Sequence, residues 1–349
     1  MCCLFHLSMD YPYSISVKTQ VRRLGYFSAF LFVIPKSGIL KLVLYKELFK
    51  YFYSEKNNNS ILKSGIIIFN LNKIPNSFSN YIAACKSLGL ITIEKEIIFP
   101  TNKGLILKSI LTDNENNKSF LNLNRIEKIF YFKLILEFDF YRFDCVRNLL
   151  ISFPMSNLAL MQKEFKIFYL KYLKNKIVPH LEKDSQDLLS VISKVQDWKS
   201  PKRYSEDIIP PRLNWGLDLG IFNVEGGKWY LLKNFQNLHY STSLSYVVER
   251  LDSTENIAWS DLFEESKLTL LNKYLILSKK YFSTLNFPRI PLSDSICLVV
   301  FQLLKNENIL AKEKEIESTI LEHEKIGKYS YRVRKSAREF ESYIYIKHE

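Results

Sequence analysis

The chain has 349 residues, of which 49 are Lys or Arg and 36 are Asp or Glu, so its formal net charge is +13. A hydrophobic content of 47% with 14% aromatic residues excludes a chain that is disordered throughout, and the length provides for two or three compact units. The excess of positive charge favours acidic partners, with nucleic acid first and anionic membrane second.

An apolar run at residues 24–34 is the first predicted element. It follows Arg22 and Arg23 and superficially resembles an export signal. A membrane-spanning helix needs roughly 20 apolar residues, whereas lysines interrupt the chain soon after this run. We therefore expect residues 24–34 to be buried core, without membrane contact.

Two helices and a hairpin are predicted in the first third of the chain. Apolar residues recur at helical spacing over 40–53, and a second helix begins after Pro75 and ends at Gly89. Glycine accepts the left-handed conformation that ends a helix, which makes it a typical stop. Apolar residues then alternate over 91–99, which predicts two short strands with Lys95 at the tip of their hairpin.

Residues 121–198 show a helical pattern almost throughout, with breaks near Pro154 and Pro179. Part of this stretch carries an aromatic-rich stripe with steps of three and four residues, which fits either core or the seam of a dimer. We expect core, and we expect residues 200–203 to form a loop. The stripe consists of Ile129, Phe130, Phe132, Leu136, Phe140 and Phe143.

The pattern of helix, glycine stop and hairpin returns in the second half of the chain. A helix is predicted to end at Gly220, and residues 223–231 predict a hairpin with Gly226 and Gly227 in its turn and Lys228 at its tip. Apolar residues stand at the same offsets before both glycine stops, which indicates an internal repeat. They are Ile82, Ala84 and Leu88 in the first copy and Leu213, Trp215 and Leu219 in the second.

Three helical stretches are predicted in the last third, at residues 235–285, 293–305 and 313–324. Residues 329–340 then predict a basic amphipathic helix. One face of this helix holds Val333, Ala337 and Phe340, and residues 343–347 predict either its continuation or a strand. Its cations gather on the other side, at Arg332, Arg334, Lys335 and Arg338.

Through residues 82–99 and 213–231, and more weakly through its last 40 or so residues, the chain resembles the winged helix-turn-helix superfamily. The resemblance implies a mainly α fold with small β-hairpins, in which tandem winged-helix units are joined by helical segments. It also implies DNA binding. We expect an N-terminal winged-helix-like domain at 1–115, a helical linker or dimerisation region at 116–199, a second winged-helix-like unit with a helical extension at 200–290 and a basic helix-turn-helix-like unit at 291–349.

Contacts with nucleic acid are expected from the basic C-terminal helix, the hairpin tips and the helix that precedes the second hairpin. In a helix-turn-helix the second helix enters the major groove, where Arg pairs with guanine while other cations hold the phosphates. The alternatives are a solvated charged face for the C-terminal helix and solubilising lysines at the tips. The candidate residues are Arg332, Arg334, Lys335, Arg338, Arg212, Asn214, Lys95 and Lys228.

No constellation for catalysis or for metal binding is recognisable, and we expect no cofactor. The 5 His residues never occur at metal-ligand spacing, and the 5 Cys residues lack the spacing of a zinc ribbon, so we expect reduced thiols in a cytoplasmic protein. The favoured function is a non-enzymatic protein that binds double-stranded DNA, as a regulator or an accessory subunit of a DNA-processing or defence complex. The alternative is an adaptor whose winged-helix units dock partner proteins or a second copy.

Overall fold

Helices dominate the chain, and its strands form small sheets, as the sequence predicts. The structure is a computed structural model. It describes residues 17–18, 20–53, 74–111, 122–177, 182–283, 289–323, 325–326, 329–335 and 342–348. Three groups of elements follow one another along the chain, and we call them the first unit (25–100), the second unit (140–231) and the third unit (264–348).

The first unit contains the two helices and the hairpin predicted before residue 100. Its first strand pairs with its last strand, Ile39 opposite Ile98, which gives the sheet order β1-β3-β2. The apolar run expected as core forms α1 and is buried along most of its length. The elements are α1 (Gly25–Val33), β1 (Ile39–Leu40), α2 (Lys41–Tyr53), α4 (Asn76–Ser87), β2 (Ile91–Glu94) and β3 (Ile97–Pro100).

The second unit has the same order of elements with one helix added. Its first strand again pairs with its last, Ser156 opposite Trp229, in the sheet order β4-β6-β5. The added helix is α9, which packs against α8. The elements are α7 (Phe140–Ser152), β4 (Ser156–Asn157), α8 (Leu158–Asn175), α9 (Glu182–Gln196), α10 (Pro201–Leu219), β5 (Phe222–Glu225) and β6 (Lys228–Leu231).

The third unit repeats the order a third time. Its first strand pairs with its last, Ile290 opposite Ile344, in the sheet order β8-β12-β11, and β10 (Lys325–Ile326) extends the edge. Ile344 and Ile346 point into the core, at 0% and 1% exposure. The other elements are α12 (Glu264–Phe282), β8 (Arg289–Pro291), α13 (Leu292–Asn306), α14 (Glu313–Glu322), β11 (Tyr329–Lys335) and β12 (Ser342–His348).

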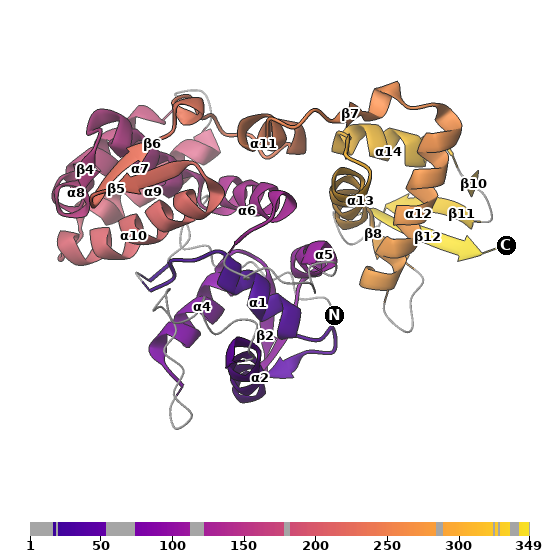
Figure 1. Cartoon of the computed structure of the whole chain (residues 1–349), viewed down its shortest axis with the longest axis horizontal. Helices are drawn as coiled ribbons and strands as arrows, with labels where there is room; N and C mark the ends of the chain where they lie inside the picture. Colours follow the sequence, from indigo (N-terminus) through magenta and orange to yellow (C-terminus); the bar gives the residue numbers. More distant parts are fainter. Residues whose placement is uncertain are drawn as a thin grey trace.

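Helices α5 (Asn102–Leu111) and α6 (Arg125–Phe138) lie between the units, and α11 (Leu244–Leu251) runs from the second to the third (Figure 1). Gln302 on α13 donates to the Ser109 hydroxyl of α5 at 2.9 Å. All buried apolar side chains form one continuous core, which includes the predicted aromatic stripe of α6 and α7. Short connectors complete the chain at η1 (Lys233–Phe235), β7 (Ile257–Ala258), η2 (Trp259–Asp261) and β9 (Ile309–Leu310).

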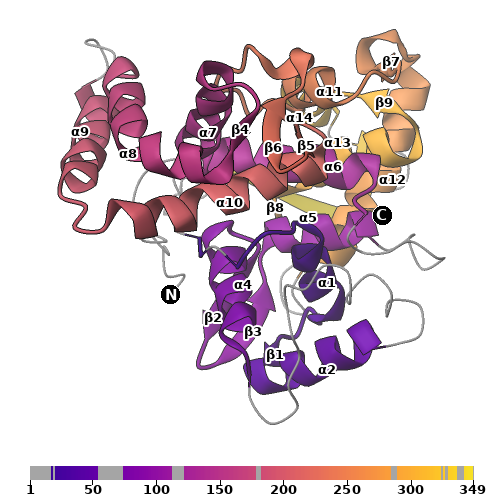
Figure 2. The same ribbon diagram turned by 60° about the vertical axis from the view of Figure 1, so that its left-hand side comes forward.

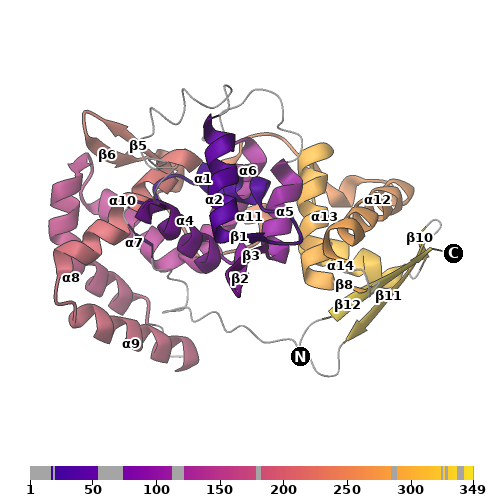
Figure 3. The ribbon, with the colours of Figure 1, turned by 90° about the horizontal axis from the view of Figure 1, so that it is seen from below.

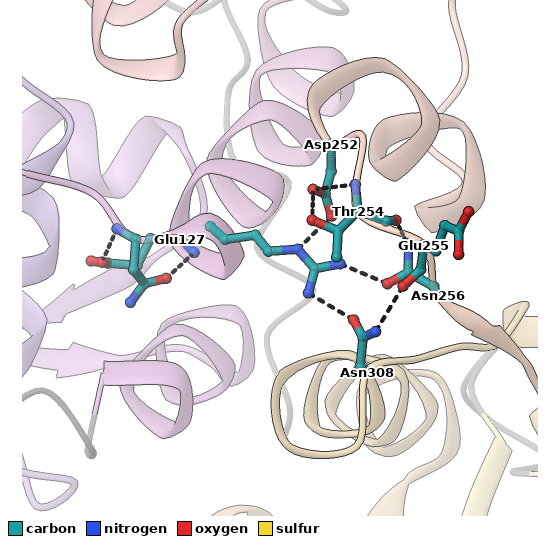
Figure 4. A network of polar contacts seen from close by, with 8 residues as sticks. Glu127, Asp252, Thr254, Glu255, Asn256 and Asn308 are labelled. Atoms are coloured by element: carbon teal, nitrogen blue, oxygen red, sulfur yellow. Dashed lines mark hydrogen bonds and ion pairs between the residues drawn. The ribbon is translucent and has the colours of Figure 1, made fainter.

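A polar network fastens α6 to the elements of the third unit (Figure 4). Arg125, at the start of α6, donates to Asn308 at 3.0 Å and to Asn256 at 2.6 Å, and it also forms an ion pair with Asp252. The neighbouring Glu127 closes the capping box that begins α6. These contacts fix α6 against the connection that joins α11 to α12.

The two predicted glycine stops are confirmed, because Gly89 and Gly220 have φ of 67° and 75°. The turns that follow are also alike. Lys95 has φ of 47° and Glu96 of 68° in the first hairpin, and Gly226 and Gly227 have 55° and 75° in the second. Two successive positive φ values are typical of the type I′ turn, whose twist matches that of the strands it joins.

Two predictions about local structure are wrong. Residues 329–335 form strand β11 and not a basic helix, because all of them pair with β12, whose isoleucines are buried in the core. Residues 201–203 belong to helix α10 and not to a loop, since Pro201 is suited to the first turn of a helix. The predicted break near Pro179 lies outside the described residues.

Candidate nucleic-acid interface

The predicted contact residues Lys95 and Lys228 both lie on hairpins and are exposed. Lys95 occupies the turn between β2 and β3, and Lys228 is the first residue of β6, directly after the Gly226-Gly227 turn. Within the described part of the chain neither lysine forms an ion pair. Lys95 stands between the exposed carboxylates of Glu94 and Glu96, so the second hairpin offers phosphate the more favourable potential.

Three of the predicted C-terminal cations lie on β11, in the hairpin of the third unit. The strand register sets Arg332 opposite Tyr345 and Arg334 opposite Tyr343, and Lys335 ends the strand. Residues directly opposite each other on neighbouring strands share one face of the sheet. The helical wheel that grouped these cations therefore does not apply. Positions 332 and 334 alternate with position 335, which is opposite Ser342 and belongs to the other face of the sheet. The fourth, Arg338, lies outside the described residues.

Strand β8 adds one residue to each of these two cross-strand pairs. Arg289 is opposite Tyr345, and Pro291 is opposite Tyr343. The Arg289 guanidinium lies 4.9 Å from the centroid of the Tyr343 ring, within the range of a cation–π contact. The face of the sheet turned away from Ile344 thus combines Arg289 with two half-buried tyrosines, and the register assigns positions 332 and 334 to the same face. Such a surface suits phosphates and planar rings.

Arg212 does not belong to the interface, and its assignment to nucleic acid is wrong. The side chain is 0% exposed, and its Nε and Nη2 donate to the two carboxylate oxygens of Asp139 at 2.8 and 2.9 Å. Its Nη1 donates to the carbonyl of Asp207 at 3.4 Å. That carbonyl lacks its usual helical donor, because Pro211, four residues on, has no N–H. Arg212 therefore holds α10 to the start of α7.

The middle of α10 is enclosed and cannot enter a DNA groove. Every residue of 208–213 is buried, since α10 packs against α6, α7 and α8, and the segment before α1 bonds to the end of this helix. Trp215 donates through Nε1 to the Val21 carbonyl at 3.1 Å, and Leu24 donates through its backbone N–H to Asp218 at 2.8 Å. The predicted contact residue Asn214 is half-buried, and its amide donates to the carbonyl of Pro210 in the same helix at 2.7 Å.

The corresponding helices of the other two units carry little positive charge on their surfaces. On α4, the outward stripe is polar and its single cation is Lys86. It consists of Asn76, Ser79, Asn80, Ala83, Lys86 and Ser87. Helix α14 carries one lysine and four glutamates, Glu313, Glu315, Glu317 and Glu322. The candidate interface therefore consists of hairpins, whereas the three helices that precede them are covered, neutral or acidic.

The sequence reasoning missed a cluster where α9 meets α10. Trp198 stacks on Tyr204 with ring centroids 4.6 Å apart and an angle of 13° between the planes. Lys199, Lys202 and Arg203 lie between these two residues in the sequence and are all exposed. The signal in the sequence was a Ser-Pro pair at a helix start with aromatic residues on both sides. The sequence alone could not show that the rings of Trp198 and Tyr204 stack on each other.

The buried cysteines of the described regions lie in the protein core. Burial raises the pKa of the Cys85 and Cys145 thiols, and it raises the pKa of Cys297 to about 12. These three thiols are therefore protonated at neutral pH. Among the described residues no group of three His, Cys, Asp or Glu could hold a metal ion. None of the described helices has the length and hydrophobicity that crossing a bilayer requires.

A scan against protein-family models and a search of curated proteins both find nothing that matches this chain.

Proposed function

We propose that this chain is a DNA-binding protein built from three winged-helix units, in which the hairpins make the principal contacts with the duplex. One observation carries the proposal. The order of helix, strand, two helices and hairpin recurs in all three units, with α9 as an additional helix in the second, and each time the first strand pairs with the last. This is the order of elements expected of a winged helix, and each hairpin carries at least one of the predicted cations. A role as regulator or accessory subunit, without chemistry of its own, is part of this proposal.

The distribution of charge supports contact through the hairpins. Lysine and arginine bound to phosphates release condensed counterions, which supplies most of the affinity for DNA that does not depend on sequence. Lys228 and the β11 positions Arg332 and Arg334 provide such cations, whereas α14 presents carboxylates that repel phosphate. Contacts of this kind position the protein and read little sequence. The expected ligand is therefore duplex DNA with modest sequence preference.

The test is the salt dependence of binding to a fluorescently labelled duplex. We expect the logarithm of the affinity to fall linearly with the logarithm of the salt concentration. Lys228→Ala and Arg334→Ala should each reduce the slope by about 1, the value for one lost phosphate contact. Lys314→Ala, on the acidic helix α14, removes the same charge from an exposed position and should leave the slope unchanged.

The absence of duplex binding at low salt would refute the proposal. Equal slope changes for Lys314→Ala and Lys228→Ala would mean that the affinity depends on net charge alone, and would refute the assignment to the hairpins.

An adaptor that docks proteins or a second copy is the alternative, and one observation favours it. Leu40, Leu42 and Val43, at the start of α2, are 50%, 55% and 41% exposed. Neighbouring exposed apolar side chains of this size commonly mark a protein contact. If this surface mediates self-association, Leu42→Ser should shift the sedimentation of the protein from dimer to monomer while duplex affinity stays the same.

A further inference from the structure

Where α9 meets α10, four aromatic rings form a column that runs from the core to the surface. Phe165 and Tyr169 of α8 are buried and stack with centroids 5.3 Å apart. Trp198 lies nearly parallel to Phe165, at 6.4 Å and 18°, and Tyr204 stacks on Trp198. Tyr204 is the outermost ring and is 44% exposed. The column supports Tyr204 from within and leaves part of its ring in contact with solvent.

Exposed cations flank this ring in the sequence. They are Lys199, Lys202 and Arg203, and no described residue forms an ion pair or a hydrogen bond with the charged group of any of them. Across residues 194–206 four basic side chains stand against two acidic ones, Asp197 and Glu206. An exposed aromatic ring beside unpaired cations matches the two parts of a nucleotide, a flat base and a phosphate.

We propose that this corner binds an unpaired nucleotide within a single-stranded segment of nucleic acid. The base stacks on Tyr204, and Lys199, Lys202 and Arg203 contact the flanking phosphates. Stacking of this kind tolerates any base, because every base has a flat π-face. The inference rests on the proposed function and adds to it a preference for duplexes that carry a single-stranded tail.

The corner is distant from the third hairpin, which allows separate tests of the two sites. In Figures 1 and 3 the α8–α9 pair and the β11–β12 hairpin lie at opposite ends of the longest axis of the molecule. Figure 2 shows α10 running from this corner towards the middle of the molecule. A substitution at Tyr204 therefore leaves the cations of the third hairpin in place.

The experiment compares a blunt duplex with the same duplex carrying a tail of ten thymidines. We expect the tailed duplex to bind about tenfold more tightly, the fold-change that one stacked base contributes. Tyr204→Ala should abolish this difference and leave blunt-duplex affinity unchanged, while Tyr204→Phe should retain it. Tyr240→Ala removes another tyrosine of similar exposure, 47%, and serves as the matched control.

A second variant removes charge and keeps the aromatic column. Lys202→Ala with Arg203→Ala should weaken tail binding and reduce its salt slope by about 1.4, the value for two contacts with a single strand. If wild type and Tyr204→Ala bind the tailed duplex equally while blunt duplex still binds, the corner inference is overturned and the proposed function stands. If blunt duplex fails to bind but a Tyr204-dependent tail interaction remains, the proposed function is overturned and the corner inference stands. Displacement of the tail by thymidine monophosphate at an equal phosphate concentration would assign the corner to free nucleotides and overturn strand binding.

Discussion

At the scale of single residues, several arginines that contribute to the charge of +13 are not available to any ligand. Arg147 is 5% exposed and pairs with Asp144, while Arg212 is fully buried against Asp139. Both guanidiniums also donate to backbone carbonyls, at Phe235 and at Ile208. Burial converts these cations from possible phosphate contacts into connections between segments of the chain. The surface consequently carries fewer cations than the composition indicates, although its net charge is unchanged because Asp144 and Asp139 are buried with them.

Removal of the Arg212 side chain should therefore affect folding rather than binding. Arg212→Ala leaves the Asp139 carboxylate buried without a partner, so we expect the free energy of unfolding to fall by about 3–5 kcal/mol. Denaturation by urea measures this loss. Arg203→Ala, nine positions earlier on the same helix and exposed, should change stability by less than about 0.5 kcal/mol. Similar stabilities for the two variants would contradict a structural role for Arg212.

At the scale of elements, the first two hairpins were predictable from the sequence and the third was not. Gly89 and Gly220 indicated two helix ends, because few other residues accept their backbone conformation. The prediction of a helix at 329–340 was wrong because the spacing of Val333 and its neighbours fits one face of a helix as well as one face of a strand. Only the pairing with β12 decides between the two structures. The burial of Arg212 was likewise unpredictable, since its partner Asp139 lies far from it in sequence.

The first hairpin contains a turn that its residues do not favour. Glu96 adopts a φ of 68°, which costs an ordinary residue roughly 1–2 kcal/mol relative to glycine. Glu96→Gly should raise the free energy of unfolding by about 0.5–1 kcal/mol, the balance of relieved strain and greater chain entropy in the unfolded state. Glu94→Gly, in strand β2, should instead lower it by about 0.5–1 kcal/mol. Thermal unfolding of both variants checks the sign, and a loss of stability in both would show that the turn is unstrained.

At the scale of the whole molecule, the three units share one core and are tied together by buried polar contacts. One of these joins the segment before α1 to the end of α10. Asp218 accepts from Arg23 Nε at 2.7 Å and from the Leu24 N–H at 2.8 Å. Burial raises the pKa of this carboxyl from 3.8 to about 6, although Arg23 acts to lower it.

This pKa makes the contact sensitive to pH. The folded protein retains the Asp218 proton between about pH 4 and 6, while the unfolded chain releases it, so stability falls as the pH rises through this range. Arg23→Gln removes the opposing cation and should raise the pKa further, which extends the fall in stability above pH 6. Asp218→Asn should remove this component of the pH dependence. Urea denaturation at pH values from 4 to 8 measures all three, and parallel profiles would exclude Asp218 as the titrating group.

Helix α5 has a geometric consequence for any duplex that spans two units. Asn102 and Ser109 on this helix form hydrogen bonds with Asp294 and Gln302 on α13, and α5 also packs against α1, so it links the first unit to the third. The interval between their hairpins is therefore a property of the folded protein and not of a linker. A duplex that contacts both hairpins must have phosphates separated by that interval. The separation of phosphates along a duplex depends on the number of base pairs per turn and on the curvature of the DNA. DNA of suitable pitch would then be distinguished from DNA of unsuitable pitch without any base edge being read.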